Sequence, residues 1–276
     1  MTSSLIPSLD LLGAVADLAR RAGDAIMEIY QADDFGETRK ADESPLTLAD
    51  LAAHRVIVAG LREIDSDCPV LSEEDADIPL GVRQAWPRFW LVDPLDGTKE
   101  FIKRNGEFTV NIALIEAGRP VLGVVYAPVL DVCYLGAEGV GAFIQRSADP
   151  AESISVKNPA ADSLLRVVAS RSHSDARTVT LLQSLGGYQC LSMGSSLKLC
   201  LVAEGAADFY PRLGPTMEWD TAAAHAIVAA AGGVVCDLAG HFLTYNKADL
   251  HNPEFFVFHH EASWLLDRVR QTVVVS

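Results

Sequence analysis

Two carboxylates stand three residues apart, at Asp93 and Asp96, directly after the apolar run Trp90–Val92. Such a run is typical of the buried end of a β-strand. Pro94 fixes its own φ, and Gly97 lets the backbone approach a ligand closely or take a positive φ. Two acids on a stiff turn repel each other unless a cation lies between them, and oxygen ligands suit Mg²⁺ or Ca²⁺. The five residues alone leave open a metal site or an ordinary polar turn.

Two other acidic positions bear on this choice. Glu73 and Glu74 follow a short predicted strand at 69–71, and Asp220 precedes a helix that we predict over 221–231. Strands that are neighbours and both end in acids would bring their acids to one site. Taken alone, a run of acids is usually a solvated surface, and Asp220 suits a helix N-cap. The three groups together favour the metal site.

In combination, these motifs resemble the inositol monophosphatase superfamily, whose members are Mg²⁺-dependent, lithium-sensitive phosphomonoesterases. The resemblance rests on Asp-Pro-Leu-Asp-Gly-Thr at 93–98, Ser-Glu-Glu at 72–74 and Trp-Asp-Thr-Ala-Ala at 219–223. Three more motifs are similar to the 3'(2'),5'-bisphosphate nucleotidase branch: Asp-Gly-Thr-Lys-Glu-Phe at 96–101, Ser-Arg-Ser-His at 170–173 and Gly-Ser-Ser-Leu-Lys at 194–198. The likeness runs from Leu11 to Phe258.

The resemblance implies two Mg²⁺ ions and leaves a third open. Its implied metal ligands are Glu73, Asp93, the Leu95 carbonyl, Asp96 and Asp220. Besides Glu73, the implied catalytic residues are Asp50 and Thr98, which would accept or orient the proton of the attacking water. Thr47 to Asp50 is also close to a capping box, which would make Asp50 structural. The two roles of Asp50 are compatible.

The resemblance also implies the substrate contacts. The Gly97 and Thr98 amides would hold phosphoryl oxygens, and Ser195, Lys198 and Arg212 would contact the nucleotide, beside Glu73, Leu95, Asp96 and Asp220. Small polar residues at 194–196 precede a helix that we predict over 199–204, and a helix start favours a phosphate. Without the resemblance, the same residues indicate only a helix cap.

The implied reaction is hydrolysis of 3'-phosphoadenosine 5'-phosphate to AMP and phosphate, which would remove a by-product of sulfate assimilation. No Cys, Ser or His stands in an activated-nucleophile context, so water is the expected attacker. Two alternatives remain: a phosphatase acting on inositol 1-phosphate or fructose 1,6-bisphosphate at the same metal site, and a Mg²⁺-dependent nucleotide sensor without turnover. Lys99 and Glu100 favour the nucleotide, and the pair Asp50 and Thr98 favours turnover.

Composition limits the partners and the compartment. A net charge of −15 argues against binding to nucleic acid polymers or anionic lipid, so local cations must attract an anionic substrate. Five cysteines are scattered singly, as expected of reduced thiols in a cytoplasm. The sequence shows no signal peptide and no transmembrane segment, and leaves peripheral association with the inner membrane open. It also leaves open a monomer or a homodimer.

The expected fold is α/β (α+β), the layered αβαβα sandwich that the resemblance implies. With 276 residues and 49% hydrophobic residues, the chain can bury a large core. A polar stretch at 148–159 suggests two halves: residues 1–160 with most of the metal motifs, and residues 161–276 with the nucleotide-contact loops and the last metal ligand. The coarse pattern of helices, a largely antiparallel sheet and a mixed second half agrees with this fold.

Overall fold

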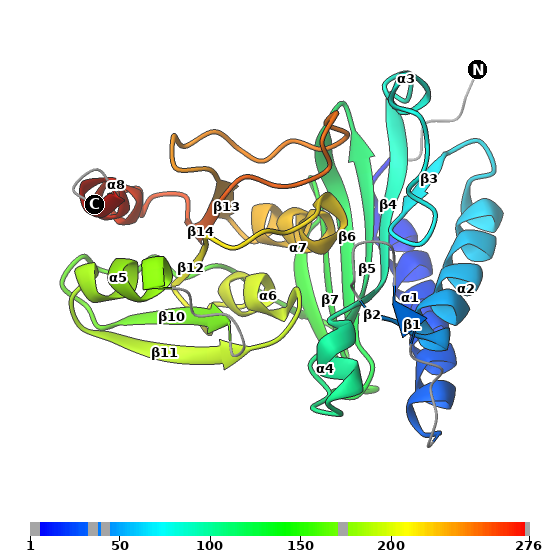
Figure 1. Cartoon of the computed structure of the whole chain (residues 1–276), viewed down its shortest axis with the longest axis horizontal. Coiled ribbons are helices and arrows are strands. Elements are labelled where there is room, and N and C mark those ends of the chain that lie inside the picture. The colour runs from blue at the N-terminus through cyan, green and yellow to red at the C-terminus, as the bar shows by residue number, and fades with distance from the viewer. Residues whose placement is uncertain (1–5, 33–37, 40–44, 171–175, 274–276) are drawn as a thin grey trace.

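The computed structural model describes residues 6–32, 38–39, 45–170 and 176–273, and within them the chain forms a seven-stranded sheet, a five-stranded sheet and a short hairpin. From right to left in Figure 1, the layers are two helices, the seven-stranded first sheet, two helices, the five-stranded second sheet and two helices. The predicted αβαβα sandwich is therefore confirmed.

The outer helices α1 (Leu9–Tyr30) and α2 (Leu48–Ile64) pack on each other and on the first sheet. Helix α1 begins after Ser8, whose hydroxyl accepts a hydrogen bond from the Leu11 amide at 3.2 Å. Its buried residues recur every three or four positions, so one apolar face meets the sheet. The hairpin β1 (Thr38–Arg39) and β2 (Pro45–Leu46) precedes α2.

The first sheet has the order β3-β4-β5-β6-β7-β8-β9. Its strands are β3 (Val70–Ser72), β4 (Arg88–Asp96), β5 (Thr109–Glu116), β6 (Arg119–Ala127), β7 (Val132–Ala137), β8 (Gly141–Arg146) and β9 (Glu152–Ser153). Only the β3–β4 pair is parallel, and all other pairs in this sheet of described residues are antiparallel. Helix α3 (Leu80–Arg83) lies between β3 and β4, and α4 (Thr98–Ile102) follows β4.

Helices α6 (Leu197–Ala203) and α7 (Glu218–Ala230) fill the space between the sheets. Helix α7 is rich in buried alanines and lies very close to the first sheet, because glycines face it. A Cβ on Gly123 would collide with the carbonyl oxygen of Ala223, and one on Gly136 would lie 2.6 Å from the Cα of Ile227. Backbone-to-backbone packing therefore sets the height of α7 above the sheet.

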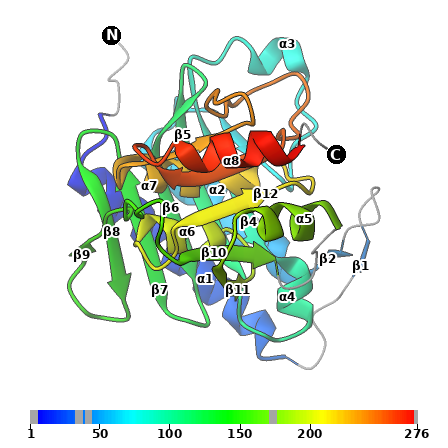
Figure 2. The same ribbon diagram turned by 90° about the vertical axis from the view of Figure 1, so that its left-hand side faces the viewer.

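The second sheet has the order β11-β10-β12-β14-β13 and mixes parallel and antiparallel pairs. Its strands are β10 (Leu165–Ser170), β11 (Tyr188–Met193), β12 (Phe209–Arg212), β13 (Gly233–Cys236) and β14 (Phe255–His259). Helices α5 (Ala176–Ser184) and α8 (Trp264–Val273) cover its outer face, which Figure 2 views from outside. The division at residue 160 stays a prediction, since one buried cluster draws residues from both halves.

The predicted boundaries of β4 and α6 were wrong. Strand β4 continues through the acidic motif to Asp96 instead of ending at Val92, because Asp93 and Asp96 still pair with β5. Helix α6 begins at Leu197, not at 199, so Lys198 lies in its first turn.

All five cysteines lie in the described residues and are free, and only Cys190 is exposed. No helix among the described residues combines the length and the apolar character that crossing a membrane requires.

Candidate metal and phosphate site

The parallel pairing of β3 and β4 brings the first two acidic motifs together. Ser72 lies opposite Val92, and the Glu73 amide donates a hydrogen bond to the Val92 carbonyl at 3.0 Å. Glu73, directly after β3, and Asp93, within β4, therefore lie next to each other on adjacent strands. The expectation that neighbouring strands would place their acids at one site is confirmed, with the parallel arrangement.

A β-bulge turns the two acids of β4 to a common site. Residues three apart on a regular strand point to opposite faces of the sheet. Here Asp93 pairs with Asn111 and Asp96 pairs with Thr109. Between these two pairs β4 therefore contains one residue more than β5, which is the extra residue of the bulge. The Leu95 amide donates to Asp93 Oδ1 at 3.0 Å, which fixes the bulge from within.

Helix α7 supplies the third acid. The expected N-cap role of Asp220 was wrong, because the helix begins at Glu218 and Met217 is the N-cap residue. Asp220 is the third residue of the helix, and its Oδ2 accepts a hydrogen bond from the Met217 amide at 2.8 Å. Asp93, Asp96 and Asp220 each place one carboxylate oxygen within 4.8 Å of the others. We call these three residues the acid cluster.

The electrostatics of the acid cluster suit a divalent cation. Burial, together with the carboxyls of Glu73, Asp96 and Asp220, raises the pKa of Asp93 well above its usual range. Burial and the Asp96 and Glu73 carboxyls likewise raise the pKa of Asp220. Three hard oxygen donors at this spacing match Mg²⁺, which would relieve their repulsion. Glu73 is not among the three, but the pairing of β3 with β4 places it next to Asp93.

Ser196 links the acid cluster to the second half of the chain, and the motif analysis did not assign it a role. Its amide donates to Asp96 Oδ2 at 2.5 Å, and its hydroxyl lies 2.7 Å from the same oxygen and 2.6 Å from the Asp220 carbonyl. Asn111 donates to the Ser196 hydroxyl at 2.8 Å. Only its place in the Gly-Ser-Ser motif indicated Ser196 in the sequence.

Asp50 has the geometry for both of its expected roles. Its Oδ2 accepts hydrogen bonds from the Thr47 amide at 2.7 Å and from the Thr47 hydroxyl at 2.6 Å, so it completes the capping box of α2. Its Oδ1 faces Thr98, whose hydroxyl donates to it at 3.4 Å. Thr98 opens α4 directly after Gly97, which has a φ of +94° that favours glycine.

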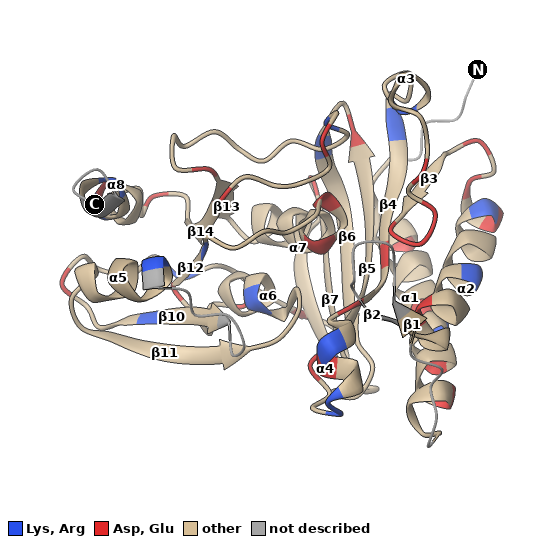
Figure 3. Cartoon of the chain, viewed as in Figure 1, with Lys and Arg blue, Asp and Glu red and all other residues tan. Residues whose placement is uncertain are grey.

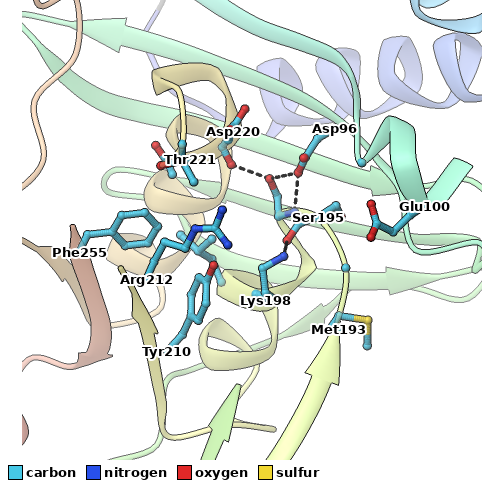
Figure 4. Close-up of a pocket in the computed structure, with 15 residues that line it drawn as sticks. Asp96, Glu100, Met193, Ser195, Lys198, Tyr210, Arg212, Asp220, Thr221 and Phe255 are labelled. Atoms are coloured by element: carbon cyan, nitrogen blue, oxygen red, sulfur yellow. Dashed lines mark hydrogen bonds between the residues drawn. The ribbon is translucent and has the colours of Figure 1, made fainter. Parts of the chain in front are cut away.

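The other predicted contacts line a pocket of about 150 Å³ beside the acid cluster. Figure 4 shows Lys198, Arg212 and Ser195 around this pocket, with Asp96 and Asp220 on its far side and Glu100 near Ser195. Ser195 takes a φ of +45°, and its carbonyl accepts a hydrogen bond from Lys198 Nζ at 2.5 Å. The pocket thus has a cationic wall next to an acidic one.

The two cations of the pocket are in different environments. Burial lowers the pKa of Lys198 to about 8, and Arg212 adds to this effect while Asp96, Glu100 and Asp220 oppose it. Arg212 is held in place by the Gly214 carbonyl at 3.1 Å and the Pro215 carbonyl at 2.9 Å. Figure 3 shows that basic residues lie on α4 as well as on α6.

The Ser-Arg-Ser-His motif at 170–173 lies largely outside the described residues. Residues 171–173 of the Ser-Arg-Ser-His stretch lie outside the described residues, so the structure does not place that predicted nucleotide loop. The other candidate residues all lie on the elements around the pocket and the acid cluster: Asp50, Glu73, Asp93, Leu95, Asp96, Gly97, Thr98, Ser195, Lys198, Arg212 and Asp220.

Two adjacent strands and the start of a helix supply the acids of this site. Comparison with known proteins identifies the class of protein that has this fold and this site. Residues 10–272 match the model of the Inositol monophosphatase family, and the chain belongs to that family. Among solved structures, CysQ from Bacteroides thetaiotaomicron has a TM-score of 0.79 and 46% identity, covering 91% of this chain and 97% of that one. The Thermotoga maritima IMPase has a TM-score of 0.78 and 26% identity, covering 96% and 98%.

Within the family, the chain is similar to proteins of one name. It is 57% identical over 249 residues to the 3'(2'),5'-bisphosphate nucleotidase CysQ of Salmonella typhimurium, covering 90% of this chain and 99% of the relative. It is 56% identical over 251 residues to the CysQ protein of Escherichia coli K12, with the same coverage. The relatives thus belong to the branch that the sequence motifs resemble.

Proposed function

We propose that this protein is a Mg²⁺-dependent 3'(2'),5'-bisphosphate nucleotidase that hydrolyses 3'-phosphoadenosine 5'-phosphate to AMP and phosphate. The observation that carries the proposal is the acid cluster next to a pocket with two cations, Lys198 and Arg212. A substrate with two phosphates needs one place for the phosphate that is cleaved and another for the phosphate that stays. The similarity to the CysQ nucleotidases supports the proposed activity.

Glu73, the acid cluster and the Leu95 carbonyl would hold two Mg²⁺ ions. When bound, the ions acidify the attacking water and stabilise charge on the leaving oxygen. The carboxylates keep these positions because the bulge in β4, the Ser196 bonds and the start of α7 fix them. A third ion near Glu73 remains open to measurement.

Asp50 and Thr98 would handle the proton of the attacking water. The Thr98 hydroxyl donates to Asp50 Oδ1, so it could accept a hydrogen bond from the attacking water and pass its own proton to the Asp50 carboxylate as it receives the proton of the water. The capping bonds from Thr47 to Asp50 Oδ2 hold this carboxylate in one orientation. General-base assistance of this kind contributes about 10²–10⁴ in rate.

The remaining contacts would bind the phosphates. The Gly97 and Thr98 amides, at the turn into α4, would donate to the phosphoryl oxygens as negative charge develops. Lys198, Arg212 and Ser195 would bind the phosphate that is not cleaved and the adjacent ribose. An arginine suits bidentate phosphate binding, and a lysine adds a point charge.

The test compares phosphate release from 3'-phosphoadenosine 5'-phosphate, inositol 1-phosphate and 5'-AMP, with and without Mg²⁺ and Li⁺. We expect turnover of the bisphosphate only with Mg²⁺, its inhibition by Li⁺, and 5'-AMP as an end product that is not cleaved further. Preference for inositol 1-phosphate would keep the metal site and overturn the nucleotide pocket. No release from any of the esters at saturating Mg²⁺ would leave a binding protein without turnover.

A further inference from the structure

Glu218, the first residue of α7, is a fully buried acid two residues before Asp220, with 0% of its surface exposed. Its Oε2 accepts a hydrogen bond from the Asn246 amide at 2.6 Å. Its Oε1 accepts from the Lys247 amide at 3.0 Å and from Lys247 Nζ at 2.6 Å. A buried carboxylate is tolerated only when donors and a cation match it, so this is a built polar link.

The same two partners bind a buried arginine on α3. Arg83, which is 4% exposed, donates from Nη1 to Asn246 Oδ1 at 2.9 Å and to the Lys247 carbonyl at 3.2 Å. Asn246 donates back to the Arg83 carbonyl at 2.8 Å. Asn246 also takes a φ of +71°, which turns its amide and its side chain toward different partners.

This chain of contacts connects both sides of the metal site. Arg83 Nε donates to the Ile78 carbonyl at 3.2 Å, and Ile78 lies in the loop that begins with Glu73. At the other end, Glu218 opens the helix turn that carries Asp220. Figure 2 shows the orange segment between β13 and β14 reaching α3, where these contacts form. The two acid-bearing segments are thereby joined through side chains that lie outside the site.

We propose that Arg83, Asn246, Lys247 and Glu218 act as a positioning brace that holds Asp220 at its distance from Glu73 and Asp93, and so sets the affinity for Mg²⁺. The inference rests on the proposed metal site. Carboxylates gathered without a cation repel one another, and this repulsion pushes the start of α7 away from the first sheet. The brace opposes that push with hydrogen bonds shielded from water, and it touches no reacting atom.

Magnesium makes such a brace consequential. The ion demands near-ideal octahedral geometry with oxygens at about 2.0–2.1 Å, so a small displacement of one ligand lowers affinity. Residues that orient metal ligands from outside the ligand set affect metal affinity by about 10–100-fold when they are replaced. A residue that only supports folding would change the melting temperature and leave the affinity for Mg²⁺ unaltered.

The second half offers a matched control. Asp208 is also a buried acid with a basic partner: Arg166 donates to it from Nε at 3.0 Å and from its amide at 2.8 Å. This pair lies next to the start of β12, whereas Arg212 and the pocket lie at its other end. Asp208→Asn should therefore weaken the fold without reaching the acid cluster.

The experiment measures Mg²⁺ binding to chelator-treated wild type, Glu218→Gln, Lys247→Met and Asp208→Asn by calorimetry, and the rise in Tm that Mg²⁺ produces in each. We expect about tenfold or weaker Mg²⁺ binding and a smaller Tm rise for the two brace variants, and wild-type values for Asp208→Asn. The half-saturating Mg²⁺ for phosphate release should shift with the binding constant, while turnover at saturating Mg²⁺ changes less than about twofold.

Two other outcomes would overturn something specific. Brace variants that lose Tm as Asp208→Asn does, but bind Mg²⁺ like wild type, would reduce the four residues to a structural role. If Glu218→Gln does not fold, Lys247→Met decides, because it keeps both backbone hydrogen bonds to Glu218. Wild type that binds no Mg²⁺ would overturn the metal site and the brace together.

Discussion

The two sides of the site are built differently. The acid cluster lies on the ends of a buried strand and a helix, and its side chains are held by a bulge and by backbone amides. The pocket wall of Ser195, Lys198 and Arg212 lies on a short helix start and a strand end, and its cations bind carbonyl oxygens of their own loops. One side is fixed to the first sheet, whereas the two cations of the other side are held by carbonyls close to them in the sequence.

This difference suggests that the acid cluster sets the rate of the chemical step, and that the pocket wall sets the preference for a substrate. A rigid acid cluster at a sheet edge suits a step that every phosphomonoester shares. A wall made by short local elements can change its residues without moving the cluster. We therefore expect variants of the acid cluster to lower kcat for every substrate, and variants of the wall to raise KM for the bisphosphate alone.

Asp96→Asn should have the largest effect. We expect about a 10³-fold or greater loss of kcat on every phosphomonoester, because a neutral amide no longer balances the charge of the cations. The asparagine can still accept the Ser196 hydrogen bonds through its side-chain oxygen, so the fold should persist. Steady-state phosphate release with circular dichroism as the folding control checks this. Near-native turnover would contradict the metal assignment.

Thr98→Ala should lower kcat by about 10²-fold with little change in KM, because it removes the hydroxyl that would relay the proton of the attacking water to Asp50. Thr98→Ser keeps the hydroxyl and serves as the matched control, with activity close to wild type. Kinetics on 3'-phosphoadenosine 5'-phosphate at saturating Mg²⁺ measure the difference. Equal losses in both variants would point to packing of α4 as the cause.

Lys198→Met should raise KM for the bisphosphate by about 10–100-fold, since hydrogen bonds to charged groups contribute about 1.5–3 kcal/mol. We expect any basal turnover of inositol 1-phosphate, which has no second phosphate, to change much less. The ratio of the two kcat/KM values is the measurement. A parallel fall on both substrates would place Lys198 on the chemical side of the comparison.

The lowered pKa of Lys198 predicts a pH dependence with a definite sign. Above the pKa of about 8 the ammonium loses its proton, so KM for the bisphosphate should rise several-fold between pH 8 and pH 9. Lys198→Arg keeps its charge over this range and should remove the inflection. A KM profile of wild type that stays flat over the same interval would argue against a phosphate contact by this lysine.

The smallest expected effect is on stability. The pKa values of Asp93 and Asp220 are raised on folding, so the metal-free native state binds more protons than the unfolded state above the ordinary value of 3.8. The free energy of unfolding in chelator should therefore fall as pH rises from about 4. Asp220→Asn should flatten this slope in urea titrations. A wild-type slope of the opposite sign would show that these acids are not protonated without metal.

The motifs predicted which residues meet, but not how. Acids after an apolar run indicated two neighbouring strands with their acids at one site, and the parallel pairing of β3 and β4 places Glu73 next to Asp93, although β4 continues to Asp96. The bulge between Asp93 and Asp96 left no sign in the sequence, because it depends on pairing with Asn111 and Thr109 on another strand. The side of the sheet to which Asp96 turns therefore could not be predicted locally.

Helix starts were also poorly predicted, for a related reason. Asp220 had the residue type of an N-cap, yet the helix begins three residues earlier than predicted, at buried Glu218, which binds the Asn246 and Lys247 amides. Ser196 likewise gained its role through Asp96, one hundred residues away. Such contacts between distant segments override local preference, and a single sequence does not display them.

The glycines beneath α7 make the metal site dependent on residue volume. Gly123 and Gly136 contain no polar side chain, yet they decide how near Asp220 comes to the acids of β4. An added methyl group at Gly136 would lift the helix outward and enlarge the space between the carboxylates. Calcium binds at about 2.3–2.6 Å, further from its ligands than magnesium, so such a change would tilt ion selectivity toward the larger cation. We therefore expect the ion preference of the proposed metal site to depend in part on two positions that offer no ligand atom.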